Sequence, residues 1–165
     1  MGSEKTLPEL VLARTCSGCT ACCKTHAVVE LDKEPFTWCK HCSIGEGCSI
    51  YGRHPTDCKE YFCFWRQDER YLTESDRPDQ LKVVIDHHRV PFRYGRSVSM
   101  VIFREVESGA MEQPRVKEIK AKLSSAGCSV TVDILFNEEP QIYFADFCIL
   151  TPIEKRLLIM QLPSI

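Results

Sequence analysis

The chain has 165 residues, of which 44% are hydrophobic and 27% are charged. This composition is typical of one folded unit with its own core and argues against a disordered chain. The net charge of −2 indicates no basic surface for a nucleic acid, and no apolar run approaches the length of a membrane span. We therefore expect a cytoplasmic protein that binds neither nucleic acid nor membrane.

Residues 4–14 are expected to form a short helix or to lead directly into the cysteines that follow. The first fifteen residues carry charges throughout, and their only apolar run extends from Leu10 to Ala13. This run is too short for the core of a signal peptide. A reducing compartment is therefore expected, in which disulfides are rare and closely spaced cysteines bind metals.

Nine of the eleven cysteines lie in a stretch of 48 residues, 16–63. Cysteine pairs separated by two residues recur in it, and two such thiolates can bind one ion because the short loop between them curls around it. We predict a metal site and prefer it to two alternatives, structural disulfides and a redox-active dithiol. The predicted ligands are Cys16, Cys19, Cys22, Cys23, Cys39, Cys42, Cys48, Cys58 and Cys63.

The cysteines at 16–23 recur at i, i+3, i+6 and i+7, which matches one face of a helix. In a helix Cys22 lies beside the other three thiols, whereas in a loop Cys22 and Cys23 point in opposite directions. Either geometry is awkward for a single ion. The sequence therefore predicts more than one metal ion, or one ligand next to a thiol that only packs.

The number and kind of ions stay open at this point. Nine thiolates suit two separate four-thiolate zinc sites with one thiol spare, three zinc ions that share sulfurs, or one four-iron cluster with a second metal. We favour zinc over iron because closed all-thiolate sites suit a structural ion without redox chemistry. Lysines and arginines that flank the cysteines are expected to offset the negative charge of such sites: Arg14, Lys24, Lys40, Arg53, Lys59 and Arg66.

Other possible ligands are given structural roles. Cys128 and Cys148 lie in apolar surroundings far from the cysteine stretch and are expected to be core residues. His26 and His41 lie among the cysteines, where His41 is expected to hydrogen-bond a sulfur rather than bind a metal. His87 and His88 follow an expected strand, and we prefer a turn or solvent-facing role for them to a second metal site.

The composition changes after Cys63. Four large side chains are expected to anchor the two halves of the chain to each other: Phe64, Trp65, Tyr71 and Leu72. Runs of β-branched residues then predict strands, and apolar residues at helical spacing after proline predict helices. The expected strands are 81–86, 97–106, 129–136 and 141–146, with a hairpin loop at 137–140, and the expected helices are 114–127 and 152–162.

These patterns predict an α+β protein in two lobes that form one compact unit. Residues 1–69 are expected to form a loop-rich, metal-chelating cysteine lobe whose folding depends on the metal. Residues 70–165 are expected to form a small antiparallel β-sheet with one or two helices, packed against the first lobe as a scaffold or as a surface for a protein partner.

The cysteine stretch resembles the zinc- or iron-chelating domain family, the YkgJ-like C-x2-C-x2-C-C cysteine-cluster proteins of bacteria. About 50 residues carry the resemblance, and Arg77-Pro78 also resembles the family. One position departs from it, because the family commonly has arginine where this chain has His54, before Pro55. The motif residues are Cys16, Cys19, Cys22, Cys23, Trp38-Cys39-Lys40-His41-Cys42, Cys48-Ser49-Ile50-Tyr51, Pro55, Cys58-Lys59 and Cys63-Phe64-Trp65.

The resemblance implies metal binding. We expect His54 to bond a sulfur or to be neutral variation rather than to act as a ligand. Larger relatives, the flagellin lysine N-methylases, carry a similar cluster, which keeps open an alternative: an iron–sulfur or open-metal-site enzyme or enzyme accessory, for example in protein modification. The common catalytic motifs are absent from the sequence, so a structural or storage role is preferred.

Overall fold

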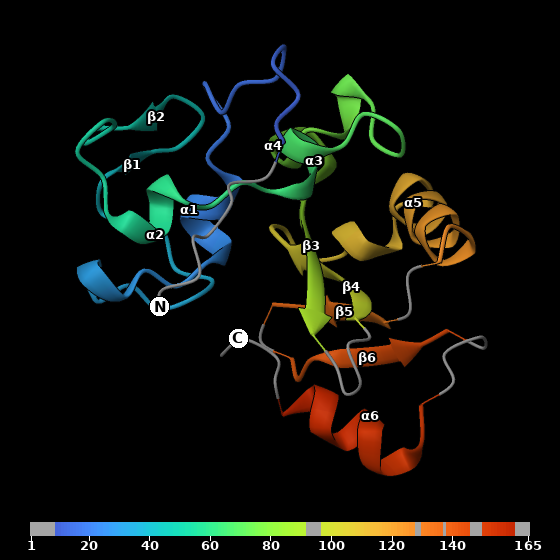
Figure 1. The fold of residues 1–165 in the computed structure, drawn as a ribbon. Coiled ribbons are helices and arrows are strands. Elements are labelled where there is room, and N and C mark those ends of the chain that lie inside the picture. Colours follow the sequence, from blue (N-terminus) through green and yellow to red (C-terminus); the bar gives the residue numbers. More distant parts are fainter. Residues whose placement is uncertain (1–8, 92–96, 128–129, 137, 146–149, 161–165) are drawn as a thin grey trace.

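The computed structural model describes residues 9–91, 97–127, 130–136, 138–145 and 150–160. In Figure 1 the first part of the chain forms a loop-rich region beside a β-sheet with later helices around it. Cys128 and Cys148 lie outside the described residues, so their predicted core role stays a prediction. Residues 1–8 also lie outside them, and residues 9–14 contain no helix.

The N-terminal lobe is loop-rich, as predicted, because its elements are only two to five residues long. Gly45 lies in the turn between its two strands and Gly47 begins the second strand, and their φ angles of +79° and +141° favour glycine. The elements are α1 (Ala21–Thr25), η1 (Val29–Leu31), β1 (Cys42–Ser43), β2 (Gly47–Cys48), α2 (Thr56–Lys59) and α3 (Phe64–Gln67).

The C-terminal lobe contains a four-stranded sheet in the order β3-β4-β5-β6. The predicted strands and both long helices are confirmed, although the first strand runs further than expected and includes His87 and His88. None of the described helices is both long and apolar enough to cross a membrane. The elements are η2 (Glu74–Asp76), α4 (Pro78–Leu81), β3 (Val83–Pro91), β4 (Ser97–Glu105), η4 (Ala110–Glu112), α5 (Pro114–Ser125), β5 (Val130–Ile134), β6 (Gln141–Phe144) and α6 (Pro152–Ile159).

The α+β class is confirmed, but the sheet is mixed rather than wholly antiparallel. The pairs β3–β4 and β5–β6 are antiparallel, whereas β4 and β5 are parallel, with Ile102 opposite Val132. The reason is that α5 lies between β4 and β5 in the sequence. A helix of this length carries the chain back across the sheet, so the next strand starts at the same end as the previous one.

The described residues form two hydrophobic core clusters, and the larger one crosses the predicted boundary between the lobes. It joins Phe64, Trp65 and Leu72 to α5 and to strands β3 and β4, which confirms their predicted anchoring role. The smaller cluster lies under α6, around Leu158. Figure 1 accordingly shows α5 and α6 on opposite sides of the sheet.

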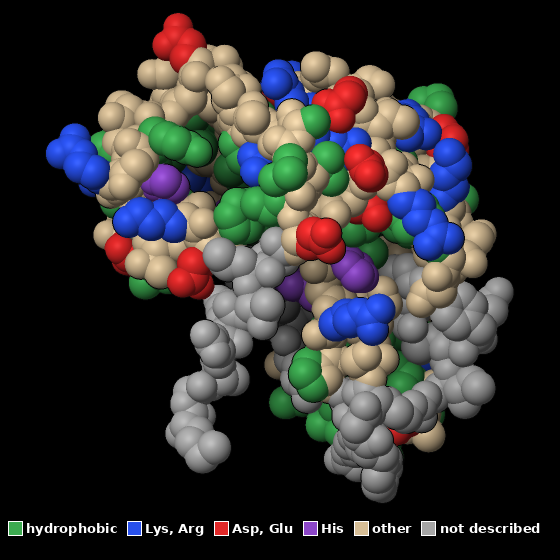
Figure 2. All heavy atoms as spheres, turned by 45° about the horizontal axis from the view of Figure 1, so that its top comes forward, with side chains coloured by type: hydrophobic (Ala, Val, Ile, Leu, Met, Phe, Trp, Pro, Cys, Tyr) green, Lys and Arg blue, Asp and Glu red, His purple; other side chains and the backbone are tan. Residues whose placement is uncertain are grey.

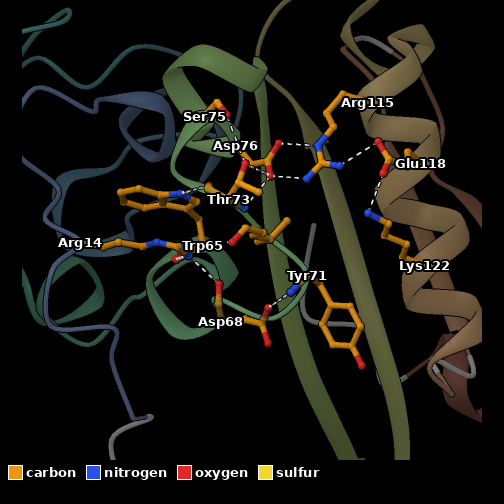
Figure 3. A network of polar contacts seen from close by, with 11 residues as sticks. Arg14, Trp65, Asp68, Tyr71, Thr73, Ser75, Asp76, Arg115, Glu118 and Lys122 are labelled. Carbon is orange, nitrogen blue, oxygen red and sulfur yellow. Dashed lines mark hydrogen bonds and ion pairs between the residues drawn. The ribbon is translucent and has the colours of Figure 1, made fainter.

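A buried carboxylate connects η2 to α5 (Figure 3). Asp76 is 2% exposed and accepts hydrogen bonds from Thr73 N at 2.7 Å and from Arg115 Nε and Nη2 at 2.8 and 2.6 Å. Burial alone raises the pKa of Asp76, but the hydrogen bonds from Arg115 and Thr73 outweigh it and lower this pKa to about 2. The ionised carboxylate therefore stabilises the folded state.

We expect Asp76→Asn to lower the free energy of unfolding by about 2 kcal/mol at pH 7. Because the folded-state pKa lies below the ordinary value of 3.8, this contribution is present above that pH and is lost as the pH falls through about 2. Urea unfolding of both proteins between pH 7 and pH 2 should therefore show a difference that shrinks below about pH 4. A difference that stays constant over this range would contradict the assignment.

Candidate metal centre

The first group of thiols consists of Cys16, Cys19, Cys22 and Cys63. A turn in which Cys19 N donates to Cys16 O at 3.0 Å places the first two, and Gly18 takes a φ of +73° in it. The pKa of Cys63 is raised to about 12, mainly by burial and to a smaller extent by neighbouring Cys16 and Cys19. The pKa of Cys22 is also raised. The largest causes are its hydrogen bond with Cys23 and its burial, and neighbouring Cys19 and Cys63 contribute as well. The four sulfurs are therefore electrostatic neighbours, although 46 residues lie between the first and the last.

The second group consists of Cys23, Cys39, Cys42, Cys48 and Cys58. The backbone joins them, because Cys39 N donates to Cys23 O at 3.0 Å and Cys42 pairs with Cys48 across β1 and β2. Burial raises the Cys42 pKa to about 12, with Cys23 as the next cause. Burial also raises the Cys58 pKa to about 11, with neighbouring Cys23, Cys39 and Cys48.

The adjacent cysteines of α1 are the point where the two groups meet. The Cys22 thiol hydrogen-bonds the Cys23 sulfur, which lowers the pKa of Cys23 to about 6 and raises that of Cys22. Both geometries expected for 16–23 occur in part, because a loop carries Cys16 and Cys19 and a helix begins at Ala21. As a result, neighbouring residues belong to different groups.

The nine thiols are electrostatic neighbours within two groups, but the structure does not place them as the ligands of a formed metal site. None of the nine described cysteines forms a disulfide. Over the described ranges, no three Cys, His, Asp or Glu side chains are placed closely enough to hold a metal ion as they stand. Chelation by this part of the chain therefore requires the sulfurs to move together.

One described cation donates to a sulfur, and a second is an electrostatic neighbour of the thiols. Arg66 Nη1 donates to Cys16 Sγ at 3.7 Å, and its buried Nε has no hydrogen-bond partner within the described residues. Lys33, which is 8% exposed, has Cys39 and Cys23 among its electrostatic neighbours. Burial lowers the pKa of Lys33, and the electrostatic contributions of Cys39 and Cys23 oppose this shift.

Of the predicted flanking cations, Arg14 and Lys24 have other roles, while Arg66 lies where expected. Arg14 donates to backbone oxygens of Trp65 and Leu72, and Lys24 donates to the oxygen of Val106. These bonds join distant segments of backbone. Both side chains therefore stabilise the fold.

The sequence reasoning missed two residues beside the thiols, Lys33 and Asp79. Asp79 hydrogen-bonds Cys19 and is held by Arg77, whose Nε and Nη2 donate to it at 2.6 and 2.7 Å. Neither residue is part of a cysteine motif, so its position could not be read from spacing. Arg77, which holds Asp79, could have been found from the sequence, because Arg77-Pro78 is part of the family resemblance.

The described histidine contacts do not involve sulfur. His26 bonds Asp86 Oδ2 at 3.2 Å, and His87 bonds Ser99 Oγ at 3.0 Å. His54 accepts a hydrogen bond from Gly52 N at 3.0 Å and stacks on Tyr51. The bond from Gly52 gives His54 a local role within its own turn.

Comparison with protein-family models, curated proteins and solved structures found no match to the chain. The resemblance to the YkgJ-like proteins therefore rests on the cysteine spacing and its neighbouring residues alone.

The surface charges are mixed. Figure 2 shows that basic and acidic side chains are interspersed over the face it draws, without one large patch of either sign.

Proposed function

We propose that this chain is a metal-binding protein of the YkgJ-like kind that chelates zinc through its nine clustered thiols. The observation that carries the proposal is that these thiols are electrostatic neighbours in two groups, with no disulfide among the described ones. Segments with up to 46 residues between them contribute to the first group. Free thiols at such density are typical of structural metal sites.

The charges around the first group fit a bound metal. A zinc ion held by four thiolates has a formal charge of −2, which requires nearby cations or hydrogen-bond donors. Arg66 supplies both, because Nη1 reaches Cys16 and Nε is a buried donor without a partner within the described residues. Metal-bound thiolates next to Arg66 would offset the destabilisation that its buried and unpaired Nε donor otherwise causes.

The division into four and five thiols favours one ion in each group. The first group has the number of ligands that tetrahedral zinc requires, and the second has one more. The Cys22–Cys23 contact also permits a shared cluster with a third ion. The four thiols of the first group equally match the ligand number of a four-iron cluster, which supports the iron–sulfur alternative.

Elemental analysis of anaerobically purified protein tests the proposal. We expect two zinc ions per chain and a colourless protein, or three ions if the groups share sulfurs. A brown protein with iron and inorganic sulfide would favour the iron–sulfur alternative. Fewer than one metal ion per chain, with all nine thiols freely titratable, would overturn metal binding itself.

A further inference from the structure

A cleft of about 660 Å³ lies between α5, β5 and β6, in the other lobe from the thiols. Lys117 and Lys120 line it from α5, Thr131 and Asp133 from β5, and Tyr143 from β6. The described sheet ends at β6, and Tyr143 stays 50% exposed there. The cleft is therefore open to small molecules from this edge.

One oxygen of a buried carboxylate in the cleft has no hydrogen-bond partner among the described residues. The Asp133 side chain is 9% exposed, and its Oδ2 accepts a hydrogen bond from Lys120 Nζ. Its Oδ1 is also buried and has no hydrogen-bond partner in the described part of the chain. A buried acceptor without a donor is destabilising, so a bound donor at this position would be favourable.

The charges of the cleft select the kind of donor. Lys117 pairs with Glu112 at 2.7 Å and Lys120 pairs with Asp133, yet further acidic side chains remain. The lining carries four carboxylates and two ammonium groups, a surplus of two negative charges: Glu105, Glu112, Asp133 and Glu138 against Lys117 and Lys120. This surplus disfavours an anion.

We propose that this cleft binds a small organic cation, whose ammonium group donates a hydrogen bond to Asp133. The carbon chain of the ligand lies against Leu135 and the ring of Tyr143, both of which line the cleft. Lys120 stays paired with the other oxygen of Asp133. The site is independent of metal binding at the thiols.

The test uses three probes with the same carbon chain: n-butylammonium, n-butanol and butyrate. Each is titrated into the isotope-labelled full chain, in its metal state as purified, and amide NMR shifts are followed. We expect saturable shifts at Thr131, Asp133 and Tyr143 with butylammonium and much weaker ones with the other two probes. Equal response to all three probes, preference for butyrate, or no saturation would overturn the proposal.

Two variants and a control sharpen the test. Asp133→Asn should weaken butylammonium binding at least about tenfold, because a charged acceptor is lost. Lys117→Gln changes only an exposed ion pair and should strengthen binding by about threefold, because the negative surplus grows. The control Glu69→Gln removes an exposed charge outside the cleft and should change nothing. If Asp133→Asn fails to fold, unchanged or weaker binding by Lys117→Gln still contradicts the proposal.

Discussion

Replacing Cys19 or Cys58 with serine is expected to release about one metal ion per chain and to unfold the surrounding loops. The two residues belong to different thiol groups, so each variant should lose the ion of its own group. The effect should be large, because structural zinc contributes on the order of 10 kcal/mol to the folding of small zinc domains. Elements of only two to five residues cannot replace that contribution by burial.

Elemental analysis and amide hydrogen exchange measure these two effects. The serine variants should lose metal and protection in the N-terminal lobe, whereas strands β3 to β6 should retain most of theirs. Cys128→Ser is a matched control, since the sequence places this cysteine far from the cysteine stretch. Loss of all metal from either single variant would indicate one shared cluster. Unchanged metal content in both would exclude Cys19 and Cys58 as ligands.

The second large effect is expected at Asp86 of β3, which joins the two lobes. This side chain is 4% exposed and contacts His26 at 3.2 Å, Arg104 Nε at 3.0 Å and the Tyr61 hydroxyl at 2.5 Å. Burial alone raises its pKa, but the hydrogen bond and charge of His26, the charge of Arg104 and the Tyr61 hydrogen bond hold the pKa well below its usual range. Asp86 is therefore ionised in the folded protein.

Asp86→Leu should lower the free energy of unfolding by about 3–5 kcal/mol, because it leaves the buried guanidinium of Arg104 without its carboxylate. Denaturant unfolding measures the loss. Adding Arg104→Met should recover much of it, since an apolar pair can replace a buried ion pair.

The matched control is Glu107→Gln in the exposed Lys82–Glu107 pair, which should cost less than about 1 kcal/mol. Similar losses at Asp86 and Glu107 would show that Asp86 does not hold the lobes together. Failure of Arg104→Met to improve on Asp86→Leu would show that the unpaired charge is not the cause.

Local sequence signals predicted the elements of the second lobe well. Pro114 and the helical spacing of Val116, Ile119 and Leu123 fixed the position of α5, because these features act within one helix. The antiparallel expectation failed only between β4 and β5. Strand direction depends on where the chain crosses the sheet, which composition within a strand does not encode.

The sequence by itself determined that nine cysteines are concentrated in residues 16–63, and it predicts shared ions for them, because spacing limits how far a short loop can separate two thiols. Only the tertiary structure decided which thiols are neighbours: Cys63 with Cys16 and Cys19, and Cys58 with Cys23 and Cys39. These thiols become neighbours because segments that are distant in the sequence pack together. Lys33 and Asp79 became neighbours of the thiols in the same way. The spacing of the cysteines does not encode contacts that arise when the chain folds back on itself.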